Sequence, residues 1–325
     1  MGFILRRLVF YFGAFLVAVV INFFLPRMMP GDPVDAMLAQ GARFTAEQIA
    51  NLRLTFGVDQ PLYQQFITYL GDVFTLELGN STFFSGMPVS EVLGNAFWWT
   101  LFLTGTATVL AFIFGATLGI VAAWYRGGKF DSFASPLSLV LQATPQLVFG
   151  IVVLFSFGVT WDLIPISYAY DPELTPTLSW EFIKNVLHHA VGPIFCIFIV
   201  QLGGFLVPMR NNMINLLNED YITMGKAKGL SNTRVMLNYG ARNAILPSVT
   251  ALSMALGFVV GGALVVEVIF NYQGLGGVLY NAIINRDYQL IQGQLLVMTV
   301  FMLAFNFLAD VLYVFLDPRL RKGGK

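Results

Sequence analysis

The side chains that commonly carry out chemistry are scarce in this chain, and their spacing favours neither a catalytic nor a metal site. The single cysteine, Cys196, lies in an apolar run, where it can form no internal disulfide and has no partners for a zinc site. The two histidines, His188 and His189, are adjacent, so they point to different sides of a helix. We therefore predict no catalytic residue and no metal ligand.

Asp310 is the only acid that falls inside a long apolar run, and Asn306 precedes it by one helical turn. An intramembrane protease needs paired aspartates, a serine with a histidine, or an H-E-x-x-H motif within its spans, and we find none of these there. The two residues are therefore interpreted as a packing or gate pair near the end of a helix.

The composition is that of a protein embedded in a lipid bilayer. Of the 325 residues, 57% are hydrophobic and only 11% are charged, whereas about a quarter of the residues of a soluble domain are charged. The mean hydropathy is +0.72. The net charge of zero provides no basic field for a nucleic-acid partner. We predict an all-α polytopic membrane protein.

Apolar runs define the helices of this protein, because about 20 apolar residues are needed to cross about 30 Å of hydrocarbon. Six runs are long enough, and an even number of spans places both termini on one side of the membrane. Most of the 18 basic residues lie on the side of the termini, so we predict that this side is cytoplasmic. The runs cover residues 8–26, 96–125, 132–161, 190–209, 243–266 and 288–309, and the last can extend past Asp310 to Leu316.

The spans divide the chain into four regions. Residues 1–26 form the cytoplasmic N-terminus and the first span, and 27–95 form an external insert. Within this insert, Thr45 and Gln48 fit a capping box, Gly57 can end the first helix, and Pro61 can open a second helix that runs to about Leu78. Spans two to six occupy residues 96–317, and a cytoplasmic tail follows at 318–325.

The longest cytoplasmic loop, residues 210–242, contains signals for two short helices. Asp220 can cap a helix that runs to about Lys228, Gly229 can end it, and a second helix begins at about Ser231. Such a pair would protrude as a docking element. The alternative is a basic connector, but a connector alone could be far shorter.

This loop resembles the docking loop of permease subunits in ATP-binding-cassette (ABC) importers. The resemblance is to the dipeptide, oligopeptide and nickel permeases of the binding-protein-dependent transport family, in the branch with a larger external insert after the first span. It is carried in the loop by Asp220-Tyr221, Lys226-Ala227-Lys228-Gly229 and Ile245-Leu246-Pro247. Further matches are Pro30-Gly31-Asp32-Pro33, Gly57-Val58-Asp59-Gln60-Pro61-Leu62, Leu78-Gly79-Asn80-Ser81, Glu267-Val268-Ile269-Phe270, Gly274-Leu275-Gly276, Arg286-Asp287-Tyr288 and Asp317-Pro318-Arg319.

The sequence departs from the family pattern at three positions. Gly225 stands where alanine is usual, Tyr239 where histidine is common, and Gln273 replaces the proline before Gly274. These departures leave the docking role in place. They leave the substrate open between di- or oligopeptides and, as alternatives, oligosaccharides or nickel.

The resemblance implies a multi-pass subunit of the cell inner membrane that works within a larger machine. Its partners would be a second homologous permease in a heterodimer, two ATPase subunits, and an extracellular or periplasmic binding protein. ATP and Mg would be bound by the ATPases, because this chain has no G-x-x-x-x-G-K-[ST] motif; it is then no enzyme and binds no cofactor. The ATPase-docking coupling helix would comprise Asp220, Tyr221, Gly225, Lys226, Ala227, Lys228, Gly229 and Leu230.

Two amides in apolar spans, Gln201 and Asn306, are predicted to line the substrate path between this chain and its partner permease. An interhelical hydrogen bond explains each amide equally well. The rival class is a secondary transporter, which would couple transport through ionisable groups near the bilayer midplane. The first five predicted spans carry no charge, which argues against it.

Overall fold

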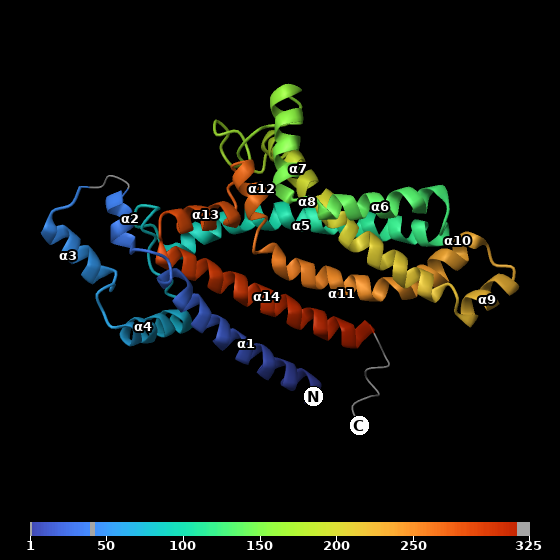
Figure 1. The fold of residues 1–325 in the computed structure, drawn as a ribbon, viewed down its shortest axis with the longest axis horizontal. Helices are drawn as coiled ribbons and strands as arrows, with labels where there is room; N and C mark the ends of the chain where they lie inside the picture. Colours follow the sequence, from blue (N-terminus) through green and yellow to red (C-terminus); the bar gives the residue numbers. More distant parts are fainter. Residues whose placement is uncertain (1, 40–42, 317–325) are drawn as a thin grey trace.

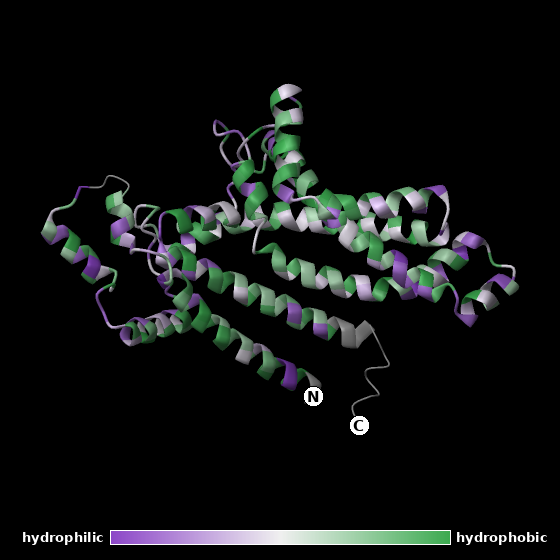
Figure 2. Cartoon of the chain, viewed as in Figure 1, coloured by the Kyte–Doolittle hydropathy of each residue, from purple (hydrophilic) through white to green (hydrophobic). Residues whose placement is uncertain are grey.

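The computed structural model describes residues 2–39 and 43–316, and within these ranges the regular structure is helical. The only β-type pairing described there is an isolated bridge between Asn80 and Pro88. The molecule is elongated, with three short helices at one end and the 210–242 loop at the other (Figure 1). Apolar residues cover the long helices, whereas polar residues concentrate toward the two ends and in the loops (Figure 2). The predicted tail at 318–325 and the motif at 317–319 lie outside the described residues.

Each of the six predicted spans has a helical counterpart. Among the described residues, five helices are long and apolar enough to cross a membrane, and a bent pair of helices raises the number to six if it counts as one span. The five are α1 (Gly2–Arg27), α5 (Val89–Trp124), α8 (Trp180–Leu216), the run formed by α10 (Asn232–Arg234), η2 (Val235–Ala241) and α11 (Arg242–Val259), and α14 (Tyr288–Leu316). The bent pair is α6 (Lys129–Ala143) with α7 (Gln146–Val153) and η1 (Leu154–Thr160). The label η marks a π-helix.

The third predicted span is broken, whereas the sequence indicated one continuous apolar run. The two halves meet at an angle of 96°. Thr144 has extended dihedrals, φ −74° and ψ 128°, directly before Pro145. The proline disfavours helical geometry in the residue before it and offers no N–H to the helix. As a result, α7 and η1 project away from the bundle beside α6 (Figure 1).

The fifth span is shorter than the predicted 243–266, because α11 ends at Val259. Gly262 takes a positive φ of 72°, and a Cβ there would lie 3.1 Å from the backbone nitrogen of Gly276. Because glycine tolerates this conformation and this close approach, the chain makes a tight turn at Gly262 and the helix does not continue. Two short helices follow, α12 (Leu264–Ile269) and α13 (Leu275–Ile284), and lie between the fifth and last spans.

Helices α5 and α8 form a close packing interface in the core of the bundle. Gly115 and Gly119, which have a G-x-x-x-G spacing, face α8. A Cβ at Gly115 would lie 2.9 Å from the carbonyl oxygen of Leu202, and one at Gly119 would lie 3.0 Å from Cβ of Met209. The glycines therefore allow the two backbones to approach more closely than any side chain would permit.

The predicted insert folds as α2 (Pro33–Ala39), α3 (Ala46–Thr55) and α4 (Leu62–Thr75). The capping box of Thr45 and Gln48 is present at the start of α3. Helix α4 ends at Thr75, before the predicted Leu78, because Leu76 turns into the left-handed region at φ 61°. The next span begins at Val89, so residues 89–95 of the predicted insert belong to α5.

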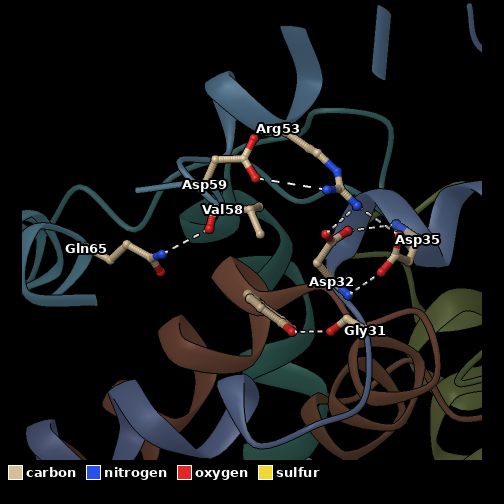
Figure 3. A network of polar contacts seen from close by, with 8 residues as sticks. Gly31, Asp32, Asp35, Arg53, Val58, Asp59 and Gln65 are labelled. Carbon is tan, nitrogen blue, oxygen red and sulfur yellow. Dashed lines mark hydrogen bonds and ion pairs between the residues drawn. The ribbon is translucent and has the colours of Figure 1, made fainter. Parts of the chain in front are cut away.

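A polar network fixes this insert to the rest of the molecule (Figure 3). The Arg53 guanidinium lies 3.2 Å from a carboxylate oxygen of Asp32 and of Asp35, and 4.0 Å from one of Asp59. The Tyr288 hydroxyl, at the start of α14, donates to the carbonyl oxygen of Gly31 at 2.6 Å. These contacts join α2, α3 and α14 at one end of the bundle.

Candidate functional site

The predicted docking element is present as α9 (Asp220–Ala227), at the end of the molecule opposite the insert (Figure 1). The N-cap position is Glu219 and makes no side-chain cap, so the predicted capping by Asp220 is wrong: Asp220 is the first helical residue. Gly229 ends the helix with φ 75°, as its predicted role requires. The Ser231 hydroxyl accepts a hydrogen bond from the backbone N–H of Arg234 at 3.4 Å and caps the next turn.

Helix α9 is held by one face, which packs against η2. Ile222 is fully buried, and Gly225 is buried beside Val235 and Tyr239. A Cβ at Gly225 would lie 3.7 Å from Val235 Cγ2 and 3.8 Å from Tyr239 Cδ1, which is ordinary van der Waals contact. The site therefore has room for the alanine that is usual in the family, and the glycine found here does not alter how α9 is held.

The opposite face of α9 is exposed among the residues that the structure describes. Met224 is 58% exposed, and Ala227 and Lys228 are exposed beside it. The Lys226 ammonium lies 5.7 Å from the ring centre of Trp124, at the end of α5, which places a cation–π contact between the docking element and a spanning helix. The element thus offers a small apolar and basic surface to a partner. The remaining predicted docking residues are Asp220, which is exposed, with Tyr221 and Leu230, which are half-buried.

An ion pair with a buried carboxylate and a partly exposed arginine lies at the same end of the bundle as α9. The Arg210 guanidinium, on α8, makes two hydrogen bonds to the Asp131 carboxylate on α6, with Nε–Oδ1 2.5 Å and Nη2–Oδ2 2.7 Å. Gly127 N and Ser135 Oγ also donate to this carboxylate. The Asp131 side chain is only 6% exposed. In the sequence, Arg210 only adds to the basic residues that predict which side of the membrane is cytoplasmic. Nothing in the spacing indicates its partner, which lies 79 residues away.

The other end of the bundle contains a cavity of about 610 Å³, here called the aromatic cavity. Its walls come from the segment before α5, the first turns of α5, the loop after η1, and α12 and α13. Aromatic rings and carboxamides dominate its lining, among them Trp99, Tyr170, Tyr272, Asn95, Gln273 and Asn281. Sequence reasoning missed the cavity, because its lining residues come from three stretches that are far apart in the chain, within residues 84–99, 168–170 and 267–281.

Three of these rings form an aromatic corner, which comprises Trp99, Tyr170 and Tyr272. Trp99 and Tyr170 are stacked with centroids 5.4 Å apart, and Tyr272 meets Trp99 edge to face at 6.2 Å. The loop that carries Tyr170 is fixed, because the backbone N–H of Tyr168 donates to the carbonyl oxygen of Phe270 at 3.1 Å. The rings are therefore held in place before any ligand arrives.

Glu267 lies in the cavity wall and is completely buried. Its carboxylate accepts hydrogen bonds from Thr100 Oγ at 2.9 Å and from the backbone N–H groups of Gly276 and Gly277 at 2.6 and 3.3 Å. The Thr100 hydroxyl in turn accepts from the backbone N–H of Leu275 at 2.7 Å. Glu267 and Thr100 thus accept hydrogen bonds from the first N–H groups of α13. In most helices a local capping residue accepts these hydrogen bonds.

The two predicted path residues lie on different helices and do not line the aromatic cavity. Gln201 is on α8, Asn306 is on α14, and α11 packs against both helices. The side-chain oxygen of Gln201 is buried without a hydrogen-bond partner. Asp310, predicted to pair with Asn306, instead accepts from the Tyr11 hydroxyl at 2.6 Å and pairs with Arg7 at 3.0 Å, which ties α14 to α1.

The adjacent histidines do face different ways, as predicted, and both hold the loop that follows η1. His188 Nε2 lies 3.2 Å from the carbonyl oxygen of Leu163. The buried His189 places Nδ1 near the Ser167 and Tyr168 carbonyls and Nε2 3.1 Å from Asp171 Oδ1. Within residues 2–39 and 43–316, no group of three or more histidine, cysteine, aspartate or glutamate residues is placed to hold a metal ion.

Comparison with known proteins covers nearly the whole chain. Residues 115–322 match the family described as binding-protein-dependent transport system inner membrane component. Residues 1–104 match its companion, described as binding-protein-dependent transport system membrane component, N-terminal.

Curated relatives match the chain over its full length. The glutathione transport system permease protein GsiC of Salmonella paratyphi A is 33% identical, and the match covers 99% of each chain. A putative peptide permease of Brucella suis is 32% identical, and the dipeptide transport system permease protein DppB of Escherichia coli is 34% identical, each with 98% of both chains covered. The chain therefore belongs to the inner membrane component family of binding-protein-dependent transport systems, the permease subunits of ABC importers.

Proposed function

We propose that this permease imports short peptides, and that α9 couples the membrane helices to ATPase subunits. The observation that carries the coupling role is the geometry of α9: one face is anchored on η2, and the other presents Met224, Ala227 and Lys228 to a partner. The substrate class is supported by the curated relatives, whose names specify dipeptide, peptide and glutathione transport.

In this proposal the chain pairs with a second homologous permease, and two ATPases that bind ATP and Mg dock on the cytoplasmic side. Closure of the ATPases on nucleotide moves α9. Because α9 packs on η2, and η2 continues directly into α11, this movement is passed to a spanning helix. The Asp131–Arg210 pair makes α6 and α8 follow the same movement. An external binding protein delivers the peptide at the opposite end, and both termini are cytoplasmic.

The path between the two permeases passes Gln201 and Asn306 in this proposal. The unpaired, buried side-chain oxygen of Gln201 supports a polar contact beyond this chain, because a buried amide without a partner costs about 1–3 kcal/mol. Alanine at both positions is expected to alter uptake while the complex still assembles.

Gly229→Trp tests the coupling role. The residue has φ 75° with no atom within 4 Å of an added Cβ, so a bulky side chain adds local strain and projects outward without clashing inside this chain. We expect assembly with the ATPases to weaken, or peptide-stimulated ATP hydrolysis to separate from uptake. Both are measured on the purified complex in proteoliposomes.

Gly57→Trp is the matched control, because Gly57 also has a positive φ, 62°, and an added Cβ there makes only ordinary contacts, but Gly57 lies in the insert at the opposite end of the molecule. It should leave assembly and coupled hydrolysis unchanged. Wild-type assembly, hydrolysis and uptake in the Gly229 variant would contradict the coupling role of α9.

The substrate class is tested with the same vesicles. ATP-driven uptake of labelled dialanine, measured with the binding protein present, should be reduced by other short peptides but not by maltotriose or nickel ions. Uptake should also persist when ionophores remove ion gradients, which separates this mechanism from secondary transport. Competition by maltotriose or nickel alone would instead favour an oligosaccharide or nickel importer.

A further inference from the structure

The charge around the aromatic cavity is one-sided. Its lining includes one carboxylate, that of Glu267, and no lysine, arginine or histidine. The three hydrogen bonds that reach this carboxyl group come from donors, two of them backbone N–H groups of α13. The lining thus offers no positive charge to an anionic ligand group, and this composition favours a cationic ligand group over an anionic one.

The aromatic corner adds a second attraction for a cation. An ammonium group within about 6 Å of a tryptophan or tyrosine ring face is attracted by the partial negative charge that the ring quadrupole places on that face. Trp99, Tyr170 and Tyr272 are clustered in one wall of the cavity, and Glu267 belongs to the same lining. Tyr272 also has a buried hydroxyl without a hydrogen-bond partner.

Carboxamide side chains supply the rest of the polar lining. Asn95 is on α5, Gln273 is in the turn before α13, and Asn281 is on α13. Each carboxamide offers both a donor and an acceptor, as a peptide bond does. This set suits a ligand that combines a free ammonium group with one or two amide bonds.

We propose that the aromatic cavity binds the amino end of an imported peptide. The ammonium group lies against the aromatic corner, and the first peptide bonds pair with Asn95, Gln273 and Asn281. The inference rests on the proposed function, because it takes the substrate to be a peptide. The peptide carboxylate points away from this wall, where no lining side chain offers a positive charge.

The test measures direct binding to the whole complex in nanodiscs, without the binding protein. The probes are trialanine, its C-terminal amide and its N-acetyl derivative, titrated by saturation-transfer difference NMR. Trialanine and its amide should bind alike, and the N-acetyl derivative roughly tenfold more weakly, a difference of about 1.4 kcal/mol, because it lacks the ammonium group. Equal binding of all three probes, or no binding of trialanine, would overturn the inference.

Neighbouring tryptophans provide matched variants. Trp99→Leu should remove the preference for a free amino end, whereas Trp99→Phe should retain it. Trp98→Leu is the control, because Trp98 is 69% exposed and does not line the cavity. A Trp99→Leu complex that still prefers trialanine over its N-acetyl form would also overturn the inference.

Uptake separates this inference from the proposed function. ATP-driven import of dialanine by the wild-type complex, together with equal binding of the three probes, would remove the cavity assignment alone. Failure of the wild-type complex to import any peptide would remove both.

Discussion

Glu267 shows how one side chain can position a whole element. Helix α13 begins without a local side-chain cap, and its first N–H groups bond to Thr100 and Glu267 from two other helices. Glu267→Ala leaves these donors unpaired in a buried place, so we expect a loss of about 3 kcal/mol in the free energy of unfolding. Thermal unfolding of the complex in nanodiscs measures this. Glu91→Ala, at an exposed acid in the first turn of α5, should change it by less than about 0.5 kcal/mol, and an equal effect of the two variants would contradict the capping role.

At the scale of elements, the buried pair between α6 and α8 is expected to keep two helices moving together. Removing one partner of such a pair costs about 3–5 kcal/mol, whereas replacing both by apolar residues is often neutral. Asp131→Ala should therefore lower the unfolding temperature and weaken peptide-stimulated ATP hydrolysis, and Asp131→Leu with Arg210→Met should recover stability. Asp59→Ala is the control, because its contact with Arg53 is exposed and 4.0 Å long. Full stability of the Asp131→Ala variant would show that the pair does not fasten these helices.

The same scale shows what could be read from the sequence and what could not. Apolar runs predicted the spans, and Thr45, Gly57 and Gly229 predicted the ends of short helices, because these signals are local. The break in the third span lies at Pro145, but a proline alone does not distinguish a mild kink from the 96° bend that is found, and the apolar run continues across it. The aromatic cavity and the Glu267 contacts were missed, because they join residues far apart in the chain and require the packed fold.

At the scale of the whole molecule, the proposal depends on which end of the bundle faces the cytoplasm. Helix α9 lies at one end of the chain's long axis, whereas α12 and α13, which contribute to the aromatic cavity, lie closer to the insert (Figure 1). A single cysteine at Asn232, which is exposed beside α9, should react only with reagents supplied from the cytoplasmic side. A cysteine at Ser85, which is exposed in the segment before α5, should react only from outside. The native Cys196 is fully buried, so it adds little background to impermeant maleimide labelling of intact cells and inverted vesicles. Labelling of both sites from one side would overturn the six-span orientation, and with it the placement of ATPase docking and peptide entry on opposite faces of the membrane.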